Sequence, residues 1–301
     1  MRKITQLNMK FFEMIKTAVF GTCLLFFCFM LFPANITAAE TLELFVSIPP
    51  QKFLADRLGG ERVTTRVLIG EGKSPHLFHP STRQLVALSQ ARLFFAIDME
   101  FERVLIEKLR HTGTLQIVNS VQDITKQVFP GHDGHDEHGA LDPHVWLSPP
   151  NLIKMAATMA AAMAEADPGN SAYYAANLER LQKEFKALDT KIAAELASFA
   201  GASFYVFHPS FAYFARRYNL HQEAVEVEGK APTPKQLSGL IKQARKENVK
   251  VIFVQKQFDP RSANSVAQAI GGKVLPLNPL AENVMENLQV MAETIRSGLS
   301  Q

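Results

Sequence analysis

Hydrophobic and polar positions follow two rhythms along residues 41–301. Short apolar runs bounded by turn residues predict buried β-strands, and apolar residues spaced by three and four between them predict amphipathic helices. Strands that alternate with helices in this way predict parallel α/β sheets. We therefore expect an α/β protein with two lobes, each built on a four-stranded, mainly parallel sheet flanked by helices. The predicted strands are Leu42–Ile48, Val63–Ile69, Leu93–Ile97 and Gln116–Val118, then Ser203–Phe207, Glu223–Val227, Val251–Val254 and Lys273–Leu277.

The longest helical pattern lies between these two halves. It begins after Asp167-Pro168 and extends from about Ser171 to Ala197. At 1.5 Å per residue, a helix of this length spans roughly 40 Å, so it could join both lobes as one rigid connector. A core helix within a single domain is the alternative. One continuous apolar stripe supports the helix: Tyr174, Leu178, Leu181, Phe185, Leu188, Ile192 and Leu196.

The N-terminal segment has the organisation of a signal peptide. Four basic residues precede an apolar run over Thr17–Phe32, and small residues follow at Thr37–Ala39. The run has about sixteen residues, fewer than the roughly 20 that a membrane-spanning helix needs. We expect cleavage after Ala39 and export from the cytoplasm. An uncleaved signal anchor is the alternative, and translation could start at Met1 or at Met9.

These patterns divide the chain into four predicted segments. Both cysteines, Cys23 and Cys28, fall in the first segment, so the mature chain could form no internal disulfide. The same segment carries four of the 32 basic residues and one of the 29 acidic residues, which leaves 28 of each sign. This balance argues against nucleic acid as a partner. The segments are a signal peptide at 1–39, an N-terminal α/β lobe at 40–168, a connecting helix at 169–200 and a C-terminal α/β lobe at 201–301.

Imidazole is the most prominent candidate chemistry in the chain. Three of the nine histidines, His132, His135 and His138, lie within the polar stretch 131–139 beside several acidic residues. Imidazole and carboxylate groups together bind divalent transition metals. We expect an exposed loop that collects metal weakly, and a solvated polar loop without a metal role is the alternative.

Three further histidines lie near the ends of predicted strands or in a polar motif between the halves. His76 follows the strand that ends at Ile69, His208 directly follows Phe207, and His144 lies in an Asp-Pro-His-Val-Trp motif. Ligands of parallel α/β proteins gather at the carboxyl ends of strands. The three imidazoles could therefore meet in a cleft between the lobes, although each of them taken alone would more often be a surface or capping residue.

Five blocks of sequence occur in order around these residues. Together they resemble the metal-binding solute-binding proteins of ABC importers, the zinc and manganese receptors. The resemblance covers essentially all of the chain after residue 39, and it implies two α/β lobes joined by a long helix with the metal between them. It also implies that His76, His144 and His208 occupy the first three ligand positions. The blocks are Val46-Ser-Ile-Pro-Pro-Gln51, Ser74-Pro-His-Leu-Phe78, Asp142-Pro-His-Val-Trp-Leu147, His208-Pro-Ser-Phe-Ala-Tyr-Phe214 and Glu228-Gly-Lys-Ala-Pro-Thr-Pro-Lys-Gln-Leu237.

The fourth ligand position departs from the pattern of that family. Relatives usually have an acidic residue before Pro-Leu, whereas this chain has Asn278 before Pro279 and Leu280. A neutral amide oxygen binds a dication more weakly than a carboxylate does, so we expect either Asn278 or water to complete a tetrahedron. Three imidazoles suit Zn²⁺, while Mn²⁺ prefers oxygen donors. Zinc is therefore the expected metal and manganese the weaker candidate; copper and nickel also bind imidazole.

The resemblance implies a periplasmic protein that captures Zn²⁺ and delivers it to an ABC permease with its cytoplasmic ATPase. We expect the mature protein to be a soluble monomer. The alternatives are an extracytoplasmic zinc buffer or adhesin and, since three histidines with an open position also describe catalytic zinc, a zinc-dependent hydrolase or lyase. The sequence has no His-Glu-x-x-His motif and no nucleophile elbow, so we expect no enzymatic activity. Three other histidines are expected at the surface, the first of them near enough to His76 to touch the site: His79, His111 and His221.

Deleting residues 131–139 tests whether the histidine-rich stretch is separate from the tight site. We expect the deletion to remove only weak additional metal equivalents, because a polar, glycine-containing loop cannot hold a rigid ligand set. Isothermal titration of the metal-free protein with zinc measures both classes of binding. Loss of the tightest binding event on deletion would place the stretch in the main site.

Overall fold

The computed structural model describes residues 41–301, apart from residues 71, 111–112, 129–140, 227–232 and 259. The predicted signal peptide lies outside the described residues. Within them, eight strands form two four-stranded sheets in which every pair of neighbouring strands is parallel. The predicted two-lobe α/β fold is therefore confirmed.

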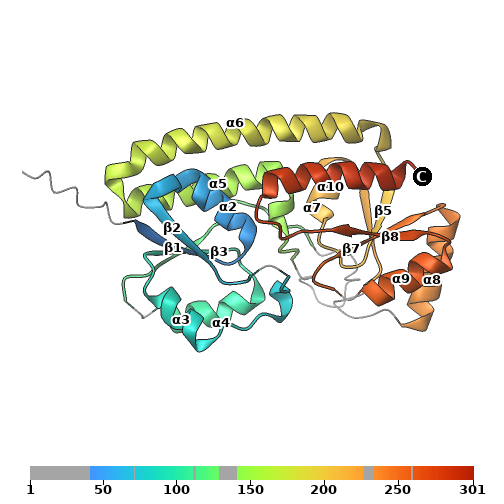
Figure 1. The fold of residues 1–301 in the computed structure, drawn as a ribbon, viewed down its shortest axis with the longest axis horizontal. Helices are drawn as coiled ribbons and strands as arrows, with labels where there is room; N and C mark the ends of the chain where they lie inside the picture. Colours follow the sequence, from blue (N-terminus) through green and yellow to red (C-terminus); the bar gives the residue numbers. More distant parts are fainter. Residues whose placement is uncertain (1–40, 71, 111–112, 129–140, 227–232, 259) are drawn as a thin grey trace, which may run out of the picture. The chain divides into compact units, whose positions relative to one another are not determined.

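The two sheets share one topology (Figure 1). The first has the order β2-β1-β3-β4, and the second has the corresponding order β6-β5-β7-β8. In each, the order reverses between the two central strands, which are β1 and β3 in the first sheet and β5 and β7 in the second. The strands are β1 (Leu42–Val46), β2 (Val63–Val67), β3 (Leu93–Ala96), β4 (Gln116–Asn119), β5 (Ser203–Val206), β6 (His221–Ala224), β7 (Val251–Gln255) and β8 (Lys273–Leu277).

Helices flank both sheets. We call β1–β4 with helices α2 to α5 the first lobe, and β5–β8 with helices α7 to α10 the second lobe. The helices are α2 (Pro49–Gly59), α3 (Thr82–Ser89), α4 (Glu100–Leu109), α5 (Pro149–Ala166), α6 (Ser171–Leu196), α7 (Ala212–Arg217), α8 (Pro234–Lys246), α9 (Pro260–Ala269) and α10 (Val284–Leu299). None of the helices formed by the described residues is both long and apolar enough to cross a membrane.

Local sequence explains where several of these helices begin. Helices α2 and α5 each start with two prolines, which fit the first helical turn because its N–H groups have no partner within the helix. Helix α3 begins after Ser81, whose hydroxyl accepts a hydrogen bond from Gln84 N, and α8 begins after Thr233 with Gln236 in the equivalent role. The residues at which these helices begin are thus fixed by short-range interactions.

Helix α6 is the predicted long connector, with 26 residues against the predicted span of Ser171 to Ala197. It contacts α2 and α5 of the first lobe and α10 of the second (Figure 1). Its apolar stripe is buried or partly buried in one hydrophobic core that also includes residues of both lobes. Because its buried stripe packs against helices of both lobes, α6 joins the two lobes as one rigid element. The fully or nearly fully buried members are Tyr174, Leu181, Phe185, Ile192 and Leu196.

Seven of the predicted strands match the observed ones to within two residues at their ends, and β6 differs most. We predicted Glu223–Val227, whereas β6 spans His221–Ala224 and pairs in parallel with Ser203–Val206. The prediction followed the apolar residues at the end of the segment, but the start of the strand is set by its register with β5. The backbone still continues alongside β5 after the strand, because Val225 N and Glu226 N donate to Val206 O and Phe207 O.

Truncating Phe185 tests the packing of the connector. This side chain is fully buried in the core shared by both lobes, so Phe185→Ala should lower the free energy of unfolding by about 3–5 kcal/mol. Lys186→Ala, at the exposed neighbouring position, should change it little. Urea unfolding of both variants measures the difference, and equal midpoints would show that the stripe of α6 does not pack as described.

Candidate metal centre

Three histidines from three separate loops meet between the lobes. His76 lies in a short 3-10 turn, Pro75–Leu77, after β2; His144 precedes the 3-10 turn Val145–Leu147 that leads into α5; His208 follows β5. Each of them offers one ligand atom, and these atoms lie within 4.8 Å of one another. The structure thus brings together the three histidines that were identified from the sequence.

The spacing of the imidazoles matches that of ligands around one ion. The Nε2 atoms of His76 and His144 are 3.3 Å apart. Two nitrogens bound at about 2.0–2.1 Å in a tetrahedral zinc site lie roughly 3.3 Å apart. Ring centroids are separated by 5.3, 5.0 and 5.3 Å for the three pairs of rings. Two neutral imidazole nitrogens at this distance are arranged like two ligands of one metal ion.

Buried carboxylates orient two of the three rings. His144 Nδ1 lies 2.7 Å from Asp142 Oδ1, and His208 Nδ1 lies 2.7 Å from Glu226 Oε2. Asp142 is fully buried, and Glu226 is 8% exposed. Donation from Nδ1 to a carboxylate fixes the tautomer in which Nε2 carries the lone pair. Both carboxylates therefore hold the rings with Nε2 available for a ligand.

The backbone of His208 is held by a buried amide side chain. Gln255, at the end of β7, accepts a hydrogen bond from His208 N at 3.2 Å and donates one to His208 O at 2.5 Å. Its Nε2 also donates to Ser210 Oγ at 3.0 Å. One side chain on the strand next to β5 thus fixes the turn in which the third histidine lies.

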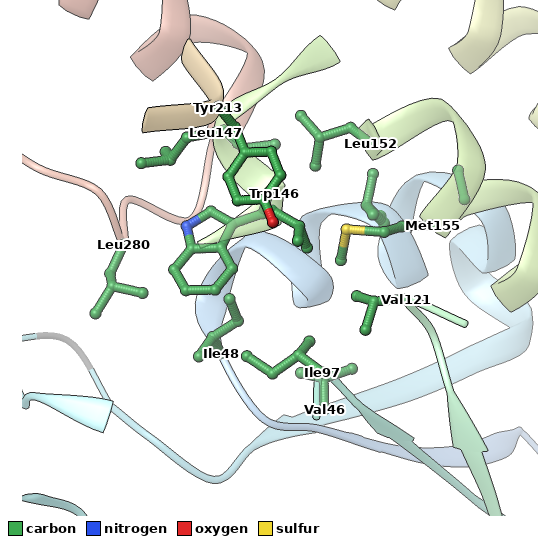
Figure 2. Close-up of a cluster of buried hydrophobic side chains, with 14 of the residues drawn as sticks. Val46, Ile48, Ile97, Val121, Trp146, Leu147, Leu152, Met155, Tyr213 and Leu280 are labelled. Atoms are coloured by element: carbon green, nitrogen blue, oxygen red, sulfur yellow. The ribbon is translucent and has the colours of Figure 1, made fainter. Parts of the chain in front are cut away.

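An apolar cluster that includes Trp146 lies beside the His144 ring. The tryptophan side chain is fully buried and belongs to a cluster that contains residues of the first lobe, such as Ile48, and of the second lobe, such as Leu280 (Figure 2). Trp146 Nε1 donates to Pro279 O at 2.7 Å, and the indole packs edge-on against His144. The tryptophan therefore supports the His144 ring and also joins the two lobes beside it.

Tyr213 makes a second connection between the lobes near the site (Figure 2). Its hydroxyl accepts a hydrogen bond from Gln127 N and donates one to Asp142 O, both at 2.9 Å. Burial raises the pKa of Tyr213 to about 12, so the hydroxyl stays protonated and able to donate. Because Asp142 also orients His144, the tyrosine ties the second lobe to the segment that carries this histidine.

Burial favours the neutral form of two of the imidazoles, His76 and His208. Although His76 as a whole residue is exposed, its ring lies among the two other rings, and burial together with the nearby His144 and His208 lowers the pKa of His76 to about 3. Burial likewise lowers the pKa of His208, although the hydrogen bond to Glu226 acts in the opposite direction. Neutral imidazole is the form that binds metal, so these two rings can bind a metal ion at neutral pH without first losing a proton.

The remaining predicted residues do not join this cluster. Asn278 Oδ1 accepts a hydrogen bond from Leu280 N at 3.1 Å, and Asn278 is not among the described residues that line the cavity of the three histidines. His79 is exposed and lines a groove against α4 that shares Pro75 and His76 with the cavity, and His221 is exposed on β6. The other candidates lie outside the described residues: His111, His132, His135 and His138.

Sequence analysis missed the groups that hold the ligands. Glu226 was included only as part of a predicted strand, and Gln255 was not considered. A charged residue in a run of otherwise apolar strand residues, as in Ala224–Val227, was the available signal for Glu226. Its partner could not be read from the sequence, since it lies 18 residues away.

Comparison with known proteins gives the family. Residues 44–298 match the family described as ZnuA, the periplasmic zinc-uptake complex component A. The chain belongs to this family. The resemblance inferred from the five sequence blocks is thereby confirmed, and family membership implies an extracytoplasmic location and a role as a transport component rather than an enzyme.

Individual relatives agree with this membership. A crystal structure of ZnuA superposes with a TM-score of 0.82 at 36% identity, covering 86% of this chain and 99% of that chain. A structure of a ZnuA deletion mutant with zinc bound gives a TM-score of 0.80, also at 36% identity, covering 86% of this chain and 98% of that chain. A putative metal-binding protein of Treponema pallidum is 27% identical, with 87% of this chain and 86% of the relative aligned. The zinc-binding protein AdcA of Streptococcus pyogenes is 25% identical, with 85% of this chain but only 54% of AdcA aligned.

The buried rings predict how the stability of the metal-free protein depends on pH. The pKa of His76 is lower in the folded protein than its ordinary value of 6.5, so the unfolded chain takes up a proton first as the pH falls. Stability that is present above pH 6.5 is therefore lost progressively in acid. We expect the urea midpoint to fall between pH 7 and pH 5, and to fall less in His76→Ala than in the parent.

Leu77→Ala is the matched control for this prediction. It alters the neighbouring residue of the same turn, whose side chain is 81% exposed and cannot titrate. It should keep the pH slope of the parent. An identical slope in all three proteins would contradict a buried, neutral His76 ring.

Proposed function

We propose that this protein captures one Zn²⁺ ion with His76, His144 and His208 and delivers it to an ABC-type importer in the membrane. The observation that carries the proposal is the cluster of three imidazole nitrogens within 4.8 Å around a small cavity. Two of the rings are oriented by buried carboxylates, as is usual for histidines that bind metal.

The donor set favours zinc over manganese. Three neutral nitrogen donors suit a borderline ion such as Zn²⁺, whereas Mn²⁺ favours sites rich in carboxylate and carbonyl oxygen. The carboxylates of Asp142 and Glu226 point at imidazole Nδ1 atoms, so they supply negative charge without acting as ligands. The zinc-binding relatives support the same choice of metal.

The size of the cavity favours transport over catalysis. A volume of about 20 Å³ in the cavity is open to a water-sized sphere, which is enough for a single ion or water. A zinc hydrolase or lyase needs room for a substrate beside the metal and for a group that moves protons. A cavity of this size fits an ion that is carried, and this agrees with a family of uptake components.

Release of the ion would require the ligand set to open. His144 and His208 are nearly buried, with exposures of 4% and 7%, and each is bonded to a buried carboxylate. His76 lies in an exposed turn of the first lobe. We therefore assign His76 as the ligand that an importer displaces first, because moving its turn disturbs no buried carboxylate.

The cellular setting follows from the same proposal. The signal peptide is cleaved after Ala39, and the mature protein acts in the periplasm as a monomer. Its partners are the permease and the cytoplasmic ATPase of the importer. In this proposal the protein has the four segments predicted from the sequence. They are a signal peptide at 1–39, an N-terminal lobe at 40–168, a connecting helix at 169–200 and a C-terminal lobe at 201–301.

Replacing His208 tests the proposed function. We expect His208→Ala to weaken zinc binding at least about 100-fold, the upper end of the effect seen for groups outside the ligand shell, because a direct nitrogen donor is lost. Competition with a chelator of known affinity measures the change. His221→Ala is the matched control, since this histidine is exposed on β6, outside the cavity; it should bind zinc like the parent.

Delivery is tested in cells that lack their own copy of this protein. The parent and His221→Ala should restore growth and zinc accumulation in zinc-limited medium, and His208→Ala should not. Normal zinc binding by His208→Ala would refute the proposed site. Normal binding by the parent without restored uptake would refute delivery and leave a buffer as the function.

A further inference from the structure

Besides the three histidines, the cavity is lined by one residue whose side-chain oxygen is enclosed by protein and has no hydrogen-bond partner among the described residues. The residues lining it include Gln257, which lies two residues after the end of β7. Gln257 Oε1 is enclosed by protein, and no hydrogen-bond donor among the described residues reaches it. An amide oxygen buried without a partner costs free energy, and such atoms are rare in folded proteins. An occupant of the cavity would give this oxygen a partner.

Residues before and after Gln257 in the chain both contact His208. Two residues earlier, Gln255 holds both backbone groups of His208. One residue later, the ring of Phe258 stacks on the His208 ring with centroids 4.9 Å apart and planes inclined by 24°. Because its neighbours on either side contact the same ligand, Gln257 has a fixed position relative to the cavity.

The topology of the second sheet places this segment where ligands bind. Strands β5 and β7 are the central neighbours at which the strand order reverses, and loops at the carboxyl ends of such strands form the binding crevice of α/β proteins. His208 follows β5, and Gln257 follows β7. The two loops of the switch point therefore both contribute polar side chains to the cavity.

Two other side-chain oxygens at or next to the cavity lining already have hydrogen-bond partners. Asn278 Oδ1 accepts a hydrogen bond from Leu280 N. Ser210 Oγ accepts one from Gln255 Nε2. Among the described residues that line the cavity, Gln257 is the one whose buried side-chain oxygen has no hydrogen-bond partner.

We propose that Gln257 Oε1 is the fourth donor to the metal ion held by His76, His144 and His208. The inference rests on the proposed function, since it assumes that the three histidines bind the ion. A neutral donor suits the charge of the site. The carboxylates of Asp142 and Glu226 are hydrogen-bonded to two of the imidazoles, and their two negative charges already match the two positive charges of the ion. An amide oxygen also binds more weakly than a carboxylate, which favours release.

The experiment compares zinc and manganese binding by the mature, metal-free protein and its variants, using chelator competition. Gln257→Ala should weaken zinc binding about tenfold, the lower end of the range for removing one supporting interaction from a metal site. Gln257→Glu should tighten zinc binding and raise manganese affinity relative to zinc, because an anionic oxygen favours the harder ion. A residue that only shaped the loop would not change the preference between metals.

Three further variants make the result unambiguous. Lys256→Ala, at the exposed neighbouring position, should match the parent. Asn278→Ala tests the rival oxygen, and zinc binding weakened by this change while Gln257→Ala matches the parent would overturn the proposal. His208→Ala, measured alongside, should lose zinc binding; if it does not, the three-histidine site itself is refuted.

The proposal stands only if Gln257→Ala weakens zinc binding and Gln257→Glu shifts the preference toward manganese. Zinc affinity within about twofold of the parent in Gln257→Ala, together with weak binding by His208→Ala, would overturn the proposal while leaving the three-histidine site intact. A loss of affinity in Gln257→Ala without any shift in metal preference in Gln257→Glu would also overturn it, since that pattern describes a supporting residue. Far-UV circular dichroism confirms that each variant is folded.

Discussion

Three imidazoles that converge on one cavity must be held there by the protein, and this requirement governs the structure around them. Their nitrogens lie within 4.8 Å of one another although the loops that carry them are separated by more than sixty residues of chain. The hydrophobic core shared by both lobes provides the holding force, since α6 packs into it along its length. Trp146 and Tyr213 add hydrogen bonds between the lobes within a few residues of the ligands. A rigid frame of this kind reduces the ordering that metal binding would otherwise require.

The electrostatic arrangement separates charge from coordination. The two carboxylates closest to the ligands face imidazole Nδ1 atoms and are buried, so they bias the rings toward the ligand-competent tautomer. Burial lowers the pKa of His76 and of His208, which removes competition by protons at neutral pH. The imidazole nitrogens face the cavity, and the carboxylates are hydrogen-bonded to the far side of two rings. This arrangement favours an ion that accepts nitrogen ligands. This arrangement agrees with membership of a zinc-uptake family.

Binding and release place opposite demands on the same ligands. Two histidines are fixed by the core, while the turn that carries His76 is exposed. Under the proposed function, this asymmetry lets the protein retain an ion between two fixed histidines and still open from one side. A neutral fourth donor serves the same balance, because each anionic oxygen added to the site would strengthen capture and slow release.

The sequence by itself determined the features that depend on local periodicity. Alternating apolar runs located most of the strands, the stripe from Tyr174 to Leu196 located the connector helix, and the motifs around His76, His144 and His208 indicated the family. The limits of β6 were wrong because a parallel strand takes its register from its partner rather than from its own apolar residues.

Tertiary structure decided which polar side chains face one another. Glu226 reaches His208 across 18 residues, Gln255 reaches the same histidine across 47, and the oxygen of Asn278 turns to its own loop at Leu280. Only the fold brings Gln257 into the cavity. The physical reason is that burial repeats along a helix or strand and so leaves a pattern in the sequence, whereas a contact between two loops depends on the path of both backbones and leaves none.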